Sequence, residues 1–523
     1  MHHRRCLKSL MPAVNQTEFM TAAGWRETLM DFCASREEFL LSDYAARIHS
    51  DYKLPELLIM LLPLLSLHRL GWEKTAAKDF RIFSIPRPEP LTLQKEPLKN
   101  MEAYLSHGEF DEELQSLIEQ FIGQVTGKAW DDPVVLERIR SAIMQQKGQY
   151  WKEGRARKIG YRKGYAVLAY LSYHAPVYIV QSLHLLLMLA RDGLLPSRAR
   201  ILDAGTGPGA LPLAATMFAR MFPAFSAEIF AVERADSFME AYRFIVPRYA
   251  SGISSLTIHP PLQADIRDAA SLPLPSSLDL IVLQNVLNEI PGRSAEKAAV
   301  ITAFSRLLAP DGSLLIVEPA DRENSTRLRI SVASALSEGL HIHSPCTVLR
   351  QRRCYPERCW SFIGQPPLRP TRLMLRLSGE RETYRFQNID IKYSYAVMVR
   401  DDRKRHPFIL PKDAPYLPFS SLSRHTGKRV NVVGTVMSGN IGDGETHVFL
   451  LCDGTQSIPV YAVLPRYHLT SENRYLLTAP YSSVIELRQV LVRFNENHQA
   501  HNLLVSRRTR IRPVERECGE PIQ

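Results

Sequence analysis

A glycine-rich segment with the chemistry of a nucleotide cradle runs from Asp203 to Gly209 (Asp-Ala-Gly-Thr-Gly-Pro-Gly), directly after a short apolar run. Glycines allow a sharp turn and let a ligand approach the backbone without a Cβ atom in the way. The helical stretch that follows offers free backbone N–H groups at its start. A purely structural tight turn has the same pattern, so the interpretation depends on the neighbouring residues.

Acidic and amide residues stand at the ends of the apolar runs that follow this segment. An acid at the position of Glu233 accepts hydrogen bonds from the ribose hydroxyls of a nucleoside, and Asp265 falls where an adenine amino group would lie. Gln284 ends a further run. The sequence therefore predicts an S-adenosylmethionine site built from Asp203, Gly205, Gly207, Gly209, Glu233, Asp265 and Gln284.

A nicotinamide dinucleotide is the competing cofactor. Dinucleotide-binding folds usually carry Gly-x-Gly-x-x-Gly, whereas the glycines here occupy every second position, at Gly205, Gly207 and Gly209. An aspartate at the strand end, as at Asp203, is also more typical of methyltransferases. S-adenosylmethionine is therefore favoured.

Signatures of known methyl-transfer chemistry are missing. The run Gln284–Glu289 (Gln-Asn-Val-Leu-Asn-Glu) lacks the Asn/Asp-Pro-Pro-aromatic motif of base amino methyltransferases, and no cysteine nucleophile follows the fourth or fifth strand. Glu289 and Glu318 are candidates for a catalytic base, although either equally serves to cap a helix or anchor a loop. The catalytic residue stays unassigned.

A second chemical cluster consists of three cysteines within fourteen residues, Cys346, Cys354 and Cys359. Thiols this close in a reducing compartment favour a metal over disulfides, and thiolates suit zinc or an iron–sulfur cluster. Three unrelated cysteines are the alternative, since the spacing is not that of a zinc knuckle. A closed site needs a fourth ligand, for which Cys452 at the end of a predicted strand is the best placed of the remaining Cys6, Cys33, Cys452 and Cys518.

The elements that position the cofactor residues show alternating strand and helix patterns from about residue 166 to 320. Four apolar runs bounded by turn residues predict strands of a parallel sheet with helices on both faces. The runs are Arg200–Ala204, Glu228–Glu233, Leu278–Leu283 and Ser313–Glu318. The predicted fold class is α/β, a class I S-adenosylmethionine-dependent methyltransferase (Rossmann-like) domain.

The flanking regions have different patterns. Apolar residues before the α/β region recur at helical spacing, as in Leu114–Phe121 and Val135–Ile143, and indicate a helical region. Strands are expected at Arg372–Leu377 and Tyr393–Val399, followed by about five strands in a small barrel of the OB type. The predicted parts are a helical region, an α/β domain with a Cys-rich segment at 340–364, and an OB-like β domain, over residues 1–165, 166–400 and 415–512.

Bulk properties favour a polyanionic partner. The 523 residues carry a formal net charge of +11, and basic runs lie at 149–163, 350–358, 403–405 and 507–510. Such runs bind phosphates, and the barrel adds weight to RNA, whereas solvated charged faces are the alternative. Seven cysteines and the lack of a secretory signal point to the cytoplasm or an organelle matrix. Leu57–Leu67 and Ile179–Leu189 are too short to span a membrane.

Several motifs together resemble the Rsm-type small ribosomal subunit protein family, methyltransferase-like assembly factors of mitochondria and prokaryotes. The resemblance runs from about residue 165 to 453 and is most specific in the Cys-rich segment. It depends on Tyr170–Pro176 with Tyr178, Asp203–Gly209, Glu318-Pro319, Pro345-Cys346, Cys354, Cys359–Phe362 and Lys392–Tyr395. His174 departs from the family, which commonly has Arg there, and the first two cysteines are further apart than usual.

This resemblance implies a 4Fe–4S cluster on Cys346, Cys354, Cys359 and Cys452, with zinc as the alternative. It also implies association with small-subunit ribosomal RNA and ribosomal proteins, without a membrane, by a chain that is monomeric off the ribosome. The cytoplasm, or the mitochondrial matrix in a eukaryote, is the expected location. The predicted function is a ribosome assembly or translation factor, and the alternative is an active RNA methyltransferase. A small-molecule methyltransferase would explain neither the basic runs nor the barrel.

Overall fold

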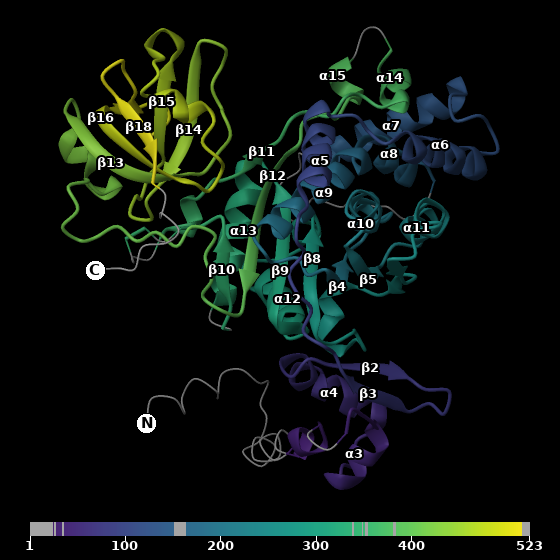
Figure 1. Cartoon of the computed structure of the whole chain (residues 1–523). Helices are drawn as coiled ribbons and strands as arrows, with labels where there is room; N and C mark the ends of the chain where they lie inside the picture. Colours follow the sequence, from purple (N-terminus) through teal and green to yellow (C-terminus); the bar gives the residue numbers. More distant parts are fainter. Residues whose placement is uncertain are drawn as a thin grey trace. The chain divides into compact units, whose positions relative to one another are not determined.

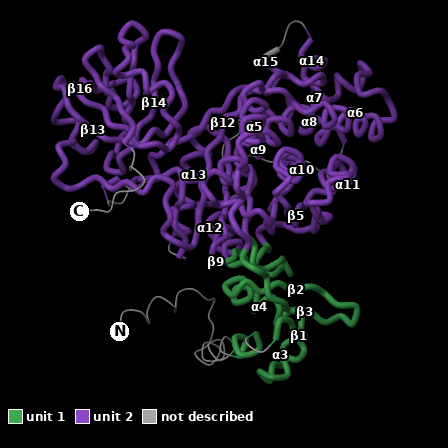
Figure 2. The backbone as a smooth tube through the Cα atoms, viewed as in Figure 1, with its two compact units in different colours: residues 1–87, 268–278, 306–310 green, residues 88–267, 279–305, 311–523 purple. Residues whose placement is uncertain are grey.

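The computed structural model describes residues 25, 28–33, 36–150, 164–336, 339–347, 349–350, 354–379 and 383–514. The chain divides into two compact units, drawn in separate colours in Figure 2. The first unit comprises residues 1–87, 268–278 and 306–310, and the second comprises residues 88–267, 279–305 and 311–523.

The first unit contains a sheet where the sequence predicted only helices. Helices α3 (Leu41–Arg47) and α4 (Leu54–Leu67) accompany an antiparallel sheet of order β1-β3-β2. The strands are β1 (Glu38–Leu40), β2 (Leu70–Lys74) and β3 (Phe80–Ser84). The prediction of a wholly helical region over residues 1–165 was therefore wrong. Strands of three to five residues have too short an alternation to detect, and cross-strand packing such as Trp72 against Phe80, at 5.5 Å between rings, stabilises them.

Helices open the second unit, as predicted. They are α5 (Lys95–His107), α6 (Glu112–Thr126) and α7 (Pro133–Tyr150). Helix α6 has its apolar face buried, and its N-terminus is capped by the Asp111 carboxylate, which accepts a hydrogen bond from Leu114 N at 2.9 Å. Gly127 in the left-handed conformation ends this helix.

A nine-stranded sheet forms the centre of the second unit, with the main strand order β10-β12-β9-β8-β4-β5-β6 (Figure 1). Strand β4 pairs in parallel with β5 and β8, whereas β12 runs antiparallel to both β9 and β10. This order, with one reversed strand near the edge, is that of class I S-adenosylmethionine-dependent methyltransferases. The strands are β4 (Arg198–Ala204), β5 (Ser226–Glu233), β6 (Leu256–Ile258), β7 (Leu262–Gln263), β8 (Leu278–Gln284), β9 (Leu308–Pro319), β10 (His341–Ser344), β11 (Ile363–Gly364) and β12 (Lys392–Val399).

Helices pack on both faces of this sheet (Figure 1). Helices α9 and α10 pack together, as do α12 and α13. No single described helix is long and apolar enough to cross a membrane, although α8 and α9, bent by 48°, meet the length and composition test as a pair. The helices are α8 (Tyr165–Tyr173), α9 (Ala175–Arg191), α10 (Ala210–Met221), α11 (Asp236–Tyr249), α12 (Ser294–Ser305) and α13 (Arg322–Ala335).

A predicted strand after the Cys-rich segment is a helix instead. Residues Arg372–Ser378 form α14, followed by α15 (Thr383–Phe386). The Thr371 hydroxyl caps α14 by accepting a hydrogen bond from Met374 N at 3.2 Å, and Leu373 and Leu377 lie four residues apart on its buried face. The sequence analysis therefore assigned this short apolar run the two-residue period of a strand, whereas its apolar residues follow the period of a helix.

The C-terminal part of the second unit is a closed barrel of the OB type, as predicted. Its order is β13-β14-β15-β17-β16, the β13–β16 pairing closes it, and β15 pairs with β17 in parallel. Strand β18 extends the sheet beside β16. The strands are β13 (Arg429–Val436), β14 (Thr446–Cys452), β15 (Val460–Pro465), β16 (Val484–Asn495), β17 (Ala500–Leu504) and β18 (Arg510–Pro513).

Candidate functional site

The glycine-rich segment forms a tight loop between β4 and α10 at the carboxyl edge of the sheet. Gly207 has a φ of +58°, and a Cβ atom built on it would meet nothing nearer than the Tyr170 hydroxyl, at 3.8 Å. Gly209 has a φ of +99°, and its added Cβ would clash with Val246 Cγ2 at 2.5 Å. Gly207 therefore leaves space for a ligand, whereas Gly209 permits the loop to pack on α11.

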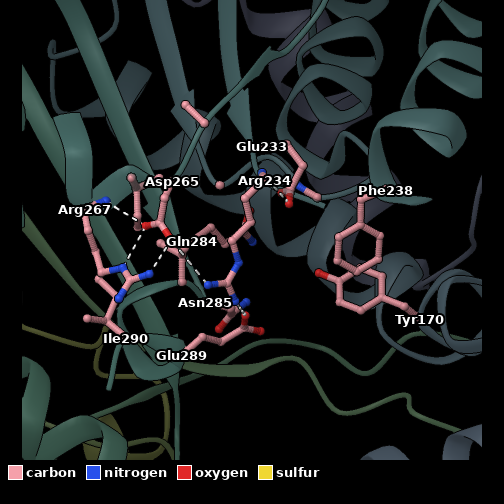
Figure 3. Close-up of a pocket in the computed structure, with 15 residues that line it drawn as sticks. Tyr170, Glu233, Arg234, Phe238, Asp265, Arg267, Gln284, Asn285, Glu289 and Ile290 are labelled. Carbon is pink, nitrogen blue, oxygen red and sulfur yellow. Dashed lines mark hydrogen bonds and ion pairs between the residues drawn. The ribbon is translucent and has the colours of Figure 1, made fainter. Parts of the chain in front are cut away.

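A pocket lies beside this loop, where the strand order changes direction around β4 (Figure 3). In open α/β sheets, ligands bind in the crevice at this point. Five predicted residues line the pocket: Gly205, Gly207, Glu233, Asp265 and Gln284. Asp203 and Gly209 are buried and are not among the lining residues. Glu289, a candidate base, and Tyr170, part of the resemblance motif, also line the pocket. The sequence analysis assigned no role to the other lining residues, Arg234, Phe238, Ala264, Ile266, Arg267, Asn285, Val286 and Ile290.

Glu233 is fixed at the edge of the pocket by three backbone hydrogen bonds. Its Oε2 accepts from Gly207 N at 2.9 Å, and its Oε1 accepts from Arg234 N and Ala235 N at 2.9 and 2.8 Å. Burial raises the pKa of Glu233, and these hydrogen bonds oppose the rise. A carboxylate has about four acceptor positions, so three bonds leave room for a ligand hydroxyl.

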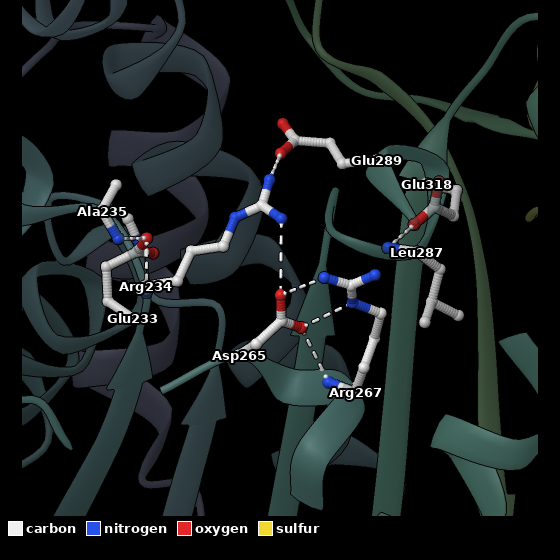
Figure 4. Close-up of polar contacts among 9 residues, drawn as sticks. Glu233, Arg234, Ala235, Asp265, Arg267, Leu287, Glu289 and Glu318 are labelled. Atoms are coloured by element: carbon white, nitrogen blue, oxygen red, sulfur yellow. Dashed lines mark hydrogen bonds and ion pairs between the residues drawn. The ribbon is translucent and has the colours of Figure 1, made fainter. Parts of the chain in front are cut away.

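An ion-pair chain crosses the other side of the pocket (Figure 4). Asp265 accepts from Arg267 Nη2 at 2.7 Å, and Arg234 lies 3.6 Å from both Asp265 Oδ2 and Glu289 Oε2. The Arg267 hydrogen bond lowers the pKa of Asp265 to about 2. Asp265 thus lies in the pocket as predicted, but its carboxylate contacts arginines. Arg234 connects the loops that follow β5, β7 and β8.

Two further predicted residues have anchoring contacts. Gln284 Oε1 accepts from Ser182 Oγ at 2.8 Å, which attaches the end of β8 to α9. Glu318 accepts from Leu287 N at 3.0 Å, and burial raises its pKa to about 8. Of the two candidate bases, Glu318 therefore anchors the loop after β8, while Glu289 faces the pocket.

Asn285 is a pocket residue that sequence reasoning did not single out. It has a φ of +54°, which is uncommon outside glycine. Among the described residues, its buried Nδ2 has no hydrogen-bond partner. Backbone strain combined with an unsatisfied polar group is typical of ligand-binding positions.

The buried carboxyl of Asp203 is expected to make the stability of the protein depend on pH. Burial raises its pKa to about 7, opposed by Thr206 and supported by the nearby Glu233 carboxylate. In the unfolded chain this carboxyl ionises near its ordinary pKa of about 3.9, so the folded state binds more protons between these values. Its contribution to the free energy of unfolding must therefore fall as pH rises from about 4 to 7. We expect Asp203→Asn to lose less thermal stability than wild type between pH 5 and pH 7.5, without cofactor. Identical losses would contradict the assignment.

The four predicted metal ligands all belong to the second unit and are free thiols. Cys346 follows β10, Cys354 and Cys359 flank the short helix η6 (Pro356–Arg358), and Cys452 ends β14. Burial, and then the Cys359 thiol, raises the pKa of Cys452 well above its usual range. Partial burial, and then Cys346 and Cys359, raises the pKa of Cys354 to about 11. Cys346 and Cys359 therefore lie close enough to both Cys354 and Cys452 to raise the pKa of these two thiols.

Within the described ranges, no group of three or more His, Cys, Asp or Glu side chains is arranged to hold a metal ion. The metal centre therefore stays a prediction. Of the other cysteines, Cys33 lies in the first unit, and Cys6 and Cys518 lie outside the described residues.

The Cys-rich segment is hydrogen-bonded to the barrel near both of its ends. Ser482 Oγ donates to Pro345 O at 2.9 Å, and Phe362 N donates to Met437 O at 3.2 Å. Arg358 also donates to the carbonyl of Ser457. Cys346 and Cys359 are therefore held at the junction between the α/β domain and the barrel.

The basic runs differ in whether their arginines make contacts within the chain or remain exposed. Arg350 lies 3.4 Å from Asp453 and donates to Tyr416 O, while Arg405 pairs with buried Asp192 at 3.2 Å. These runs thus contribute to internal contacts. Arg352 and Arg353, and the run after Tyr150, lie outside the described residues.

The barrel run 507–510 is more open than these. Arg507 donates to the backbone carbonyl of Tyr467 at 3.2 Å and leaves the aromatic ring available. Tyr467 is 69% exposed, and Arg508, next to Arg507 in sequence, is exposed as well. An exposed aromatic beside arginines is the combination that stacks on unpaired bases and neutralises phosphates.

A family model matches the barrel alone: residues 420–514 match the C-terminal domain of a family of unknown function, DUF8157. No curated protein matches the chain. Among solved structures, the magnesium protoporphyrin IX methyltransferase of Synechocystis, with bound S-adenosylhomocysteine, is 12% identical with a TM-score of 0.28. That match covers 52% of this chain and all of the other.

A TehB-like S-adenosylmethionine-dependent methyltransferase of Corynebacterium glutamicum is also similar. It is 16% identical with a TM-score of 0.24, over 42% of this chain and 88% of the other. At these identities and TM-scores, the assignment of the fold depends on the strand order of the chain itself.

Proposed function

We propose that this protein is an S-adenosylmethionine-dependent methyltransferase that acts on RNA. The observation that carries the proposal is the pocket beside β4, where the strand order changes direction. The glycine-rich loop, the Glu233 carboxylate and the Asn285 amide all line this pocket. Gly207 offers open space, and Glu233 retains an acceptor position. Asn285 presents an amide nitrogen that has no hydrogen-bond partner in the part of the chain that the structure describes. These are the groups that a nucleoside cofactor with an amino-acid tail requires.

The residues divide the work of binding as follows. Glu233 would accept a ribose hydroxyl, and the backbone at Gly207 would lie against the cofactor. Tyr170 and Phe238, with ring centres 4.8 Å apart, would exclude water from one side. Bound S-adenosylmethionine supplies an electrophilic methyl group to a nucleophilic atom of the RNA. Glu289 is the pocket carboxylate that would take a proton from that nucleophile.

RNA is the acceptor class that the rest of the chain supports. The net charge of +11 and the OB-type barrel with exposed Tyr467 suit a single-stranded polyanion. Small-subunit ribosomal RNA remains the partner that the family resemblance implies, with a role in assembly or translation.

The experiment is to incubate the protein with methyl-labelled S-adenosylmethionine and either small-subunit ribosomal RNA or transfer RNA. Label in RNA supports the proposal, and the two RNA arms separate the ribosomal partner from RNA in general. No transfer to either RNA, despite cofactor binding, would contradict an RNA methyltransferase.

The salt dependence of RNA binding tests the barrel surface. We expect Arg507→Ala with Arg508→Ala to flatten the plot of log binding constant against log salt, by roughly 0.7 per lost contact to single-stranded RNA. The control is Arg369→Ala with Lys392→Ala, which removes the same charge from ion pairs with Glu109 and Asp390. An equal slope in both double variants would mean that residues 507–508 do not contact phosphates.

We propose in addition that Cys346, Cys354, Cys359 and Cys452 hold a 4Fe–4S cluster, with zinc as the alternative. The support is the chemistry of the donor set, because three free thiols lie in the Cys-rich segment and a fourth lies at the end of β14. Soft thiolates are the ligands that such clusters take. The role of the centre would be structural, connecting the α/β domain to the barrel.

A further inference from the structure

The side chain of Arg234 extends across the candidate pocket from the end of β5 (Figure 4). Its Nη1 lies 3.6 Å from Asp265 Oδ2, and its Nη2 lies 3.6 Å from Glu289 Oε2. Asp265 follows β7, and Glu289 lies in the loop after β8. One guanidinium therefore bridges two carboxylates that come from separate loops.

Arg234 is the more weakly held of the two arginines at Asp265. Arg267 donates to Asp265 Oδ1 from its backbone N at 2.9 Å and from Nε at 3.0 Å, and to Oδ2 from Nη2 at 2.7 Å. The 3.6 Å separations of Arg234 are longer than an N–H···O hydrogen bond, and its side chain is 48% exposed. Ion pairs of this kind contribute little stability, so Arg234 is the partner that a ligand can replace.

The hydrogen bonds of Asp265 leave one acceptor position for a ligand. A carboxylate has about four such positions, and Arg267 takes two on Oδ1 and one on Oδ2. The position that remains is on Oδ2, the oxygen that faces Arg234. The sequence analysis placed the adenine amino group of the cofactor at Asp265. That amino group and the Arg234 guanidinium therefore compete for the same oxygen.

We infer that Arg234 gates the pocket, an inference that rests on the cofactor site proposed above. Before the cofactor binds, the bridge from Asp265 to Glu289 closes the adenine side of the pocket. The adenine amino group takes the remaining position on Asp265 Oδ2 and displaces Arg234 from both carboxylates. Glu289, the proposed base, loses its contact with Arg234 in the same movement. Asp265 keeps a compensating cation throughout, because Arg267 stays in place.

The gate predicts that removing the arginine strengthens binding. The wild-type protein must break two ion pairs before adenine can bind, whereas Arg234→Met has none to break. We expect Arg234→Met to bind S-adenosylhomocysteine and adenosine about three- to tenfold more tightly, in keeping with the small contribution of partly exposed ion pairs. Isothermal titration calorimetry with the full chain measures both affinities.

Salt provides a second measurement. Adenosine carries no net charge, so salt acts mainly on the protein's own ion pairs, which it screens as the Debye length falls from about 30 Å at 0.01 M to about 3 Å at 1 M. We expect the wild type to bind adenosine more tightly as salt rises over this range. The affinity of Arg234→Met should stay nearly constant, because the bridge is already absent.

Two further variants control for charge and test the bridge itself. Arg327→Met removes the same charge from a 40% exposed arginine that pairs with Glu323 and does not line the pocket, so it should bind both ligands as the wild type does. Glu289→Gln removes one ion pair of the bridge and should tighten adenosine binding by a smaller factor. It should have no such effect in the Arg234→Met background. Glu289→Gln also serves if Arg234→Met does not fold.

The outcomes separate the gate from the cofactor site. Wild-type protein that does not bind S-adenosylhomocysteine would overturn the cofactor site, and the gate with it. If the wild type binds, equal or weaker binding by Arg234→Met would overturn the gate alone, and weaker binding would make the guanidinium a partner of the adenine ring. The same salt dependence in the wild type and in Arg234→Met would also overturn the gate, as would an equal effect of Glu289→Gln in both backgrounds.

Discussion

Gly207→Arg is expected to abolish binding of S-adenosylmethionine and S-adenosylhomocysteine. The glycine lines the pocket, and nothing lies nearer to an added Cβ than 3.8 Å, so a long side chain would fill the space beside Glu233. The substituted residue also has to adopt a φ of +58°, which costs roughly 1–2 kcal/mol of stability. Isothermal titration calorimetry with both ligands measures the loss.

The control for this backbone cost is Gly252→Arg. Gly252 has a φ of +80° and nothing within 4 Å of an added Cβ, and it does not line the pocket. We expect this variant to bind both ligands with wild-type affinity and to show a similar loss of stability. Full binding by Gly207→Arg would mean that the cofactor does not bind beside the glycine-rich loop. An absence of binding in wild type would refute the cofactor proposal.

Cys452→Ser is expected to cause the second largest effect, the loss of the proposed metal centre. Cys452 ends β14, so it is the one ligand that the barrel contributes. A serine hydroxyl is a poor ligand for a metal that takes soft thiolates. Because metal binding is coupled to folding, losing one ligand should loosen the junction between the α/β domain and the barrel.

Iron and zinc contents of protein isolated without oxygen measure the first effect of Cys452→Ser. Limited proteolysis measures the second, with new cleavage expected in the connection at 401–415. Cys33→Ser is the control, since Cys33 is a partly buried free thiol of the first unit. Full metal content in the Cys452 variant would mean that another residue completes the site.

The sequence by itself determined the elements whose patterns are local. The four apolar runs became β4, β5, β8 and β9, because a buried parallel strand must be apolar along its whole length. The glycine-rich turn needed residues that tolerate positive φ, so it was recognisable in one segment. The barrel strands, bounded by turn residues, were detectable for the same reason.

Elements with weak local signals were missed or misassigned. The strands β2 and β3 are stabilised by packing such as Trp72 against Phe80. A five-residue strand is too short for its alternation of apolar and polar residues to be recognised in the sequence. Helix α14 was mistaken for a strand because a seven-residue apolar run fits both periods.

Only the tertiary structure decided how the site residues are used. Asp265, Arg234 and Glu289 come from different loops, and Arg234 lies near both carboxylates because three strand ends meet at one edge. Asp203 and Gly209 match the motif, but both are buried and neither lines the pocket. In the sequence, Arg329 resembles an ordinary surface residue of a polar helix. In the structure it is buried and donates hydrogen bonds to Ser361 Oγ and Tyr395 O. Spacing along the chain reports the backbone of one segment, whereas burial and charge pairing depend on residues distant in sequence.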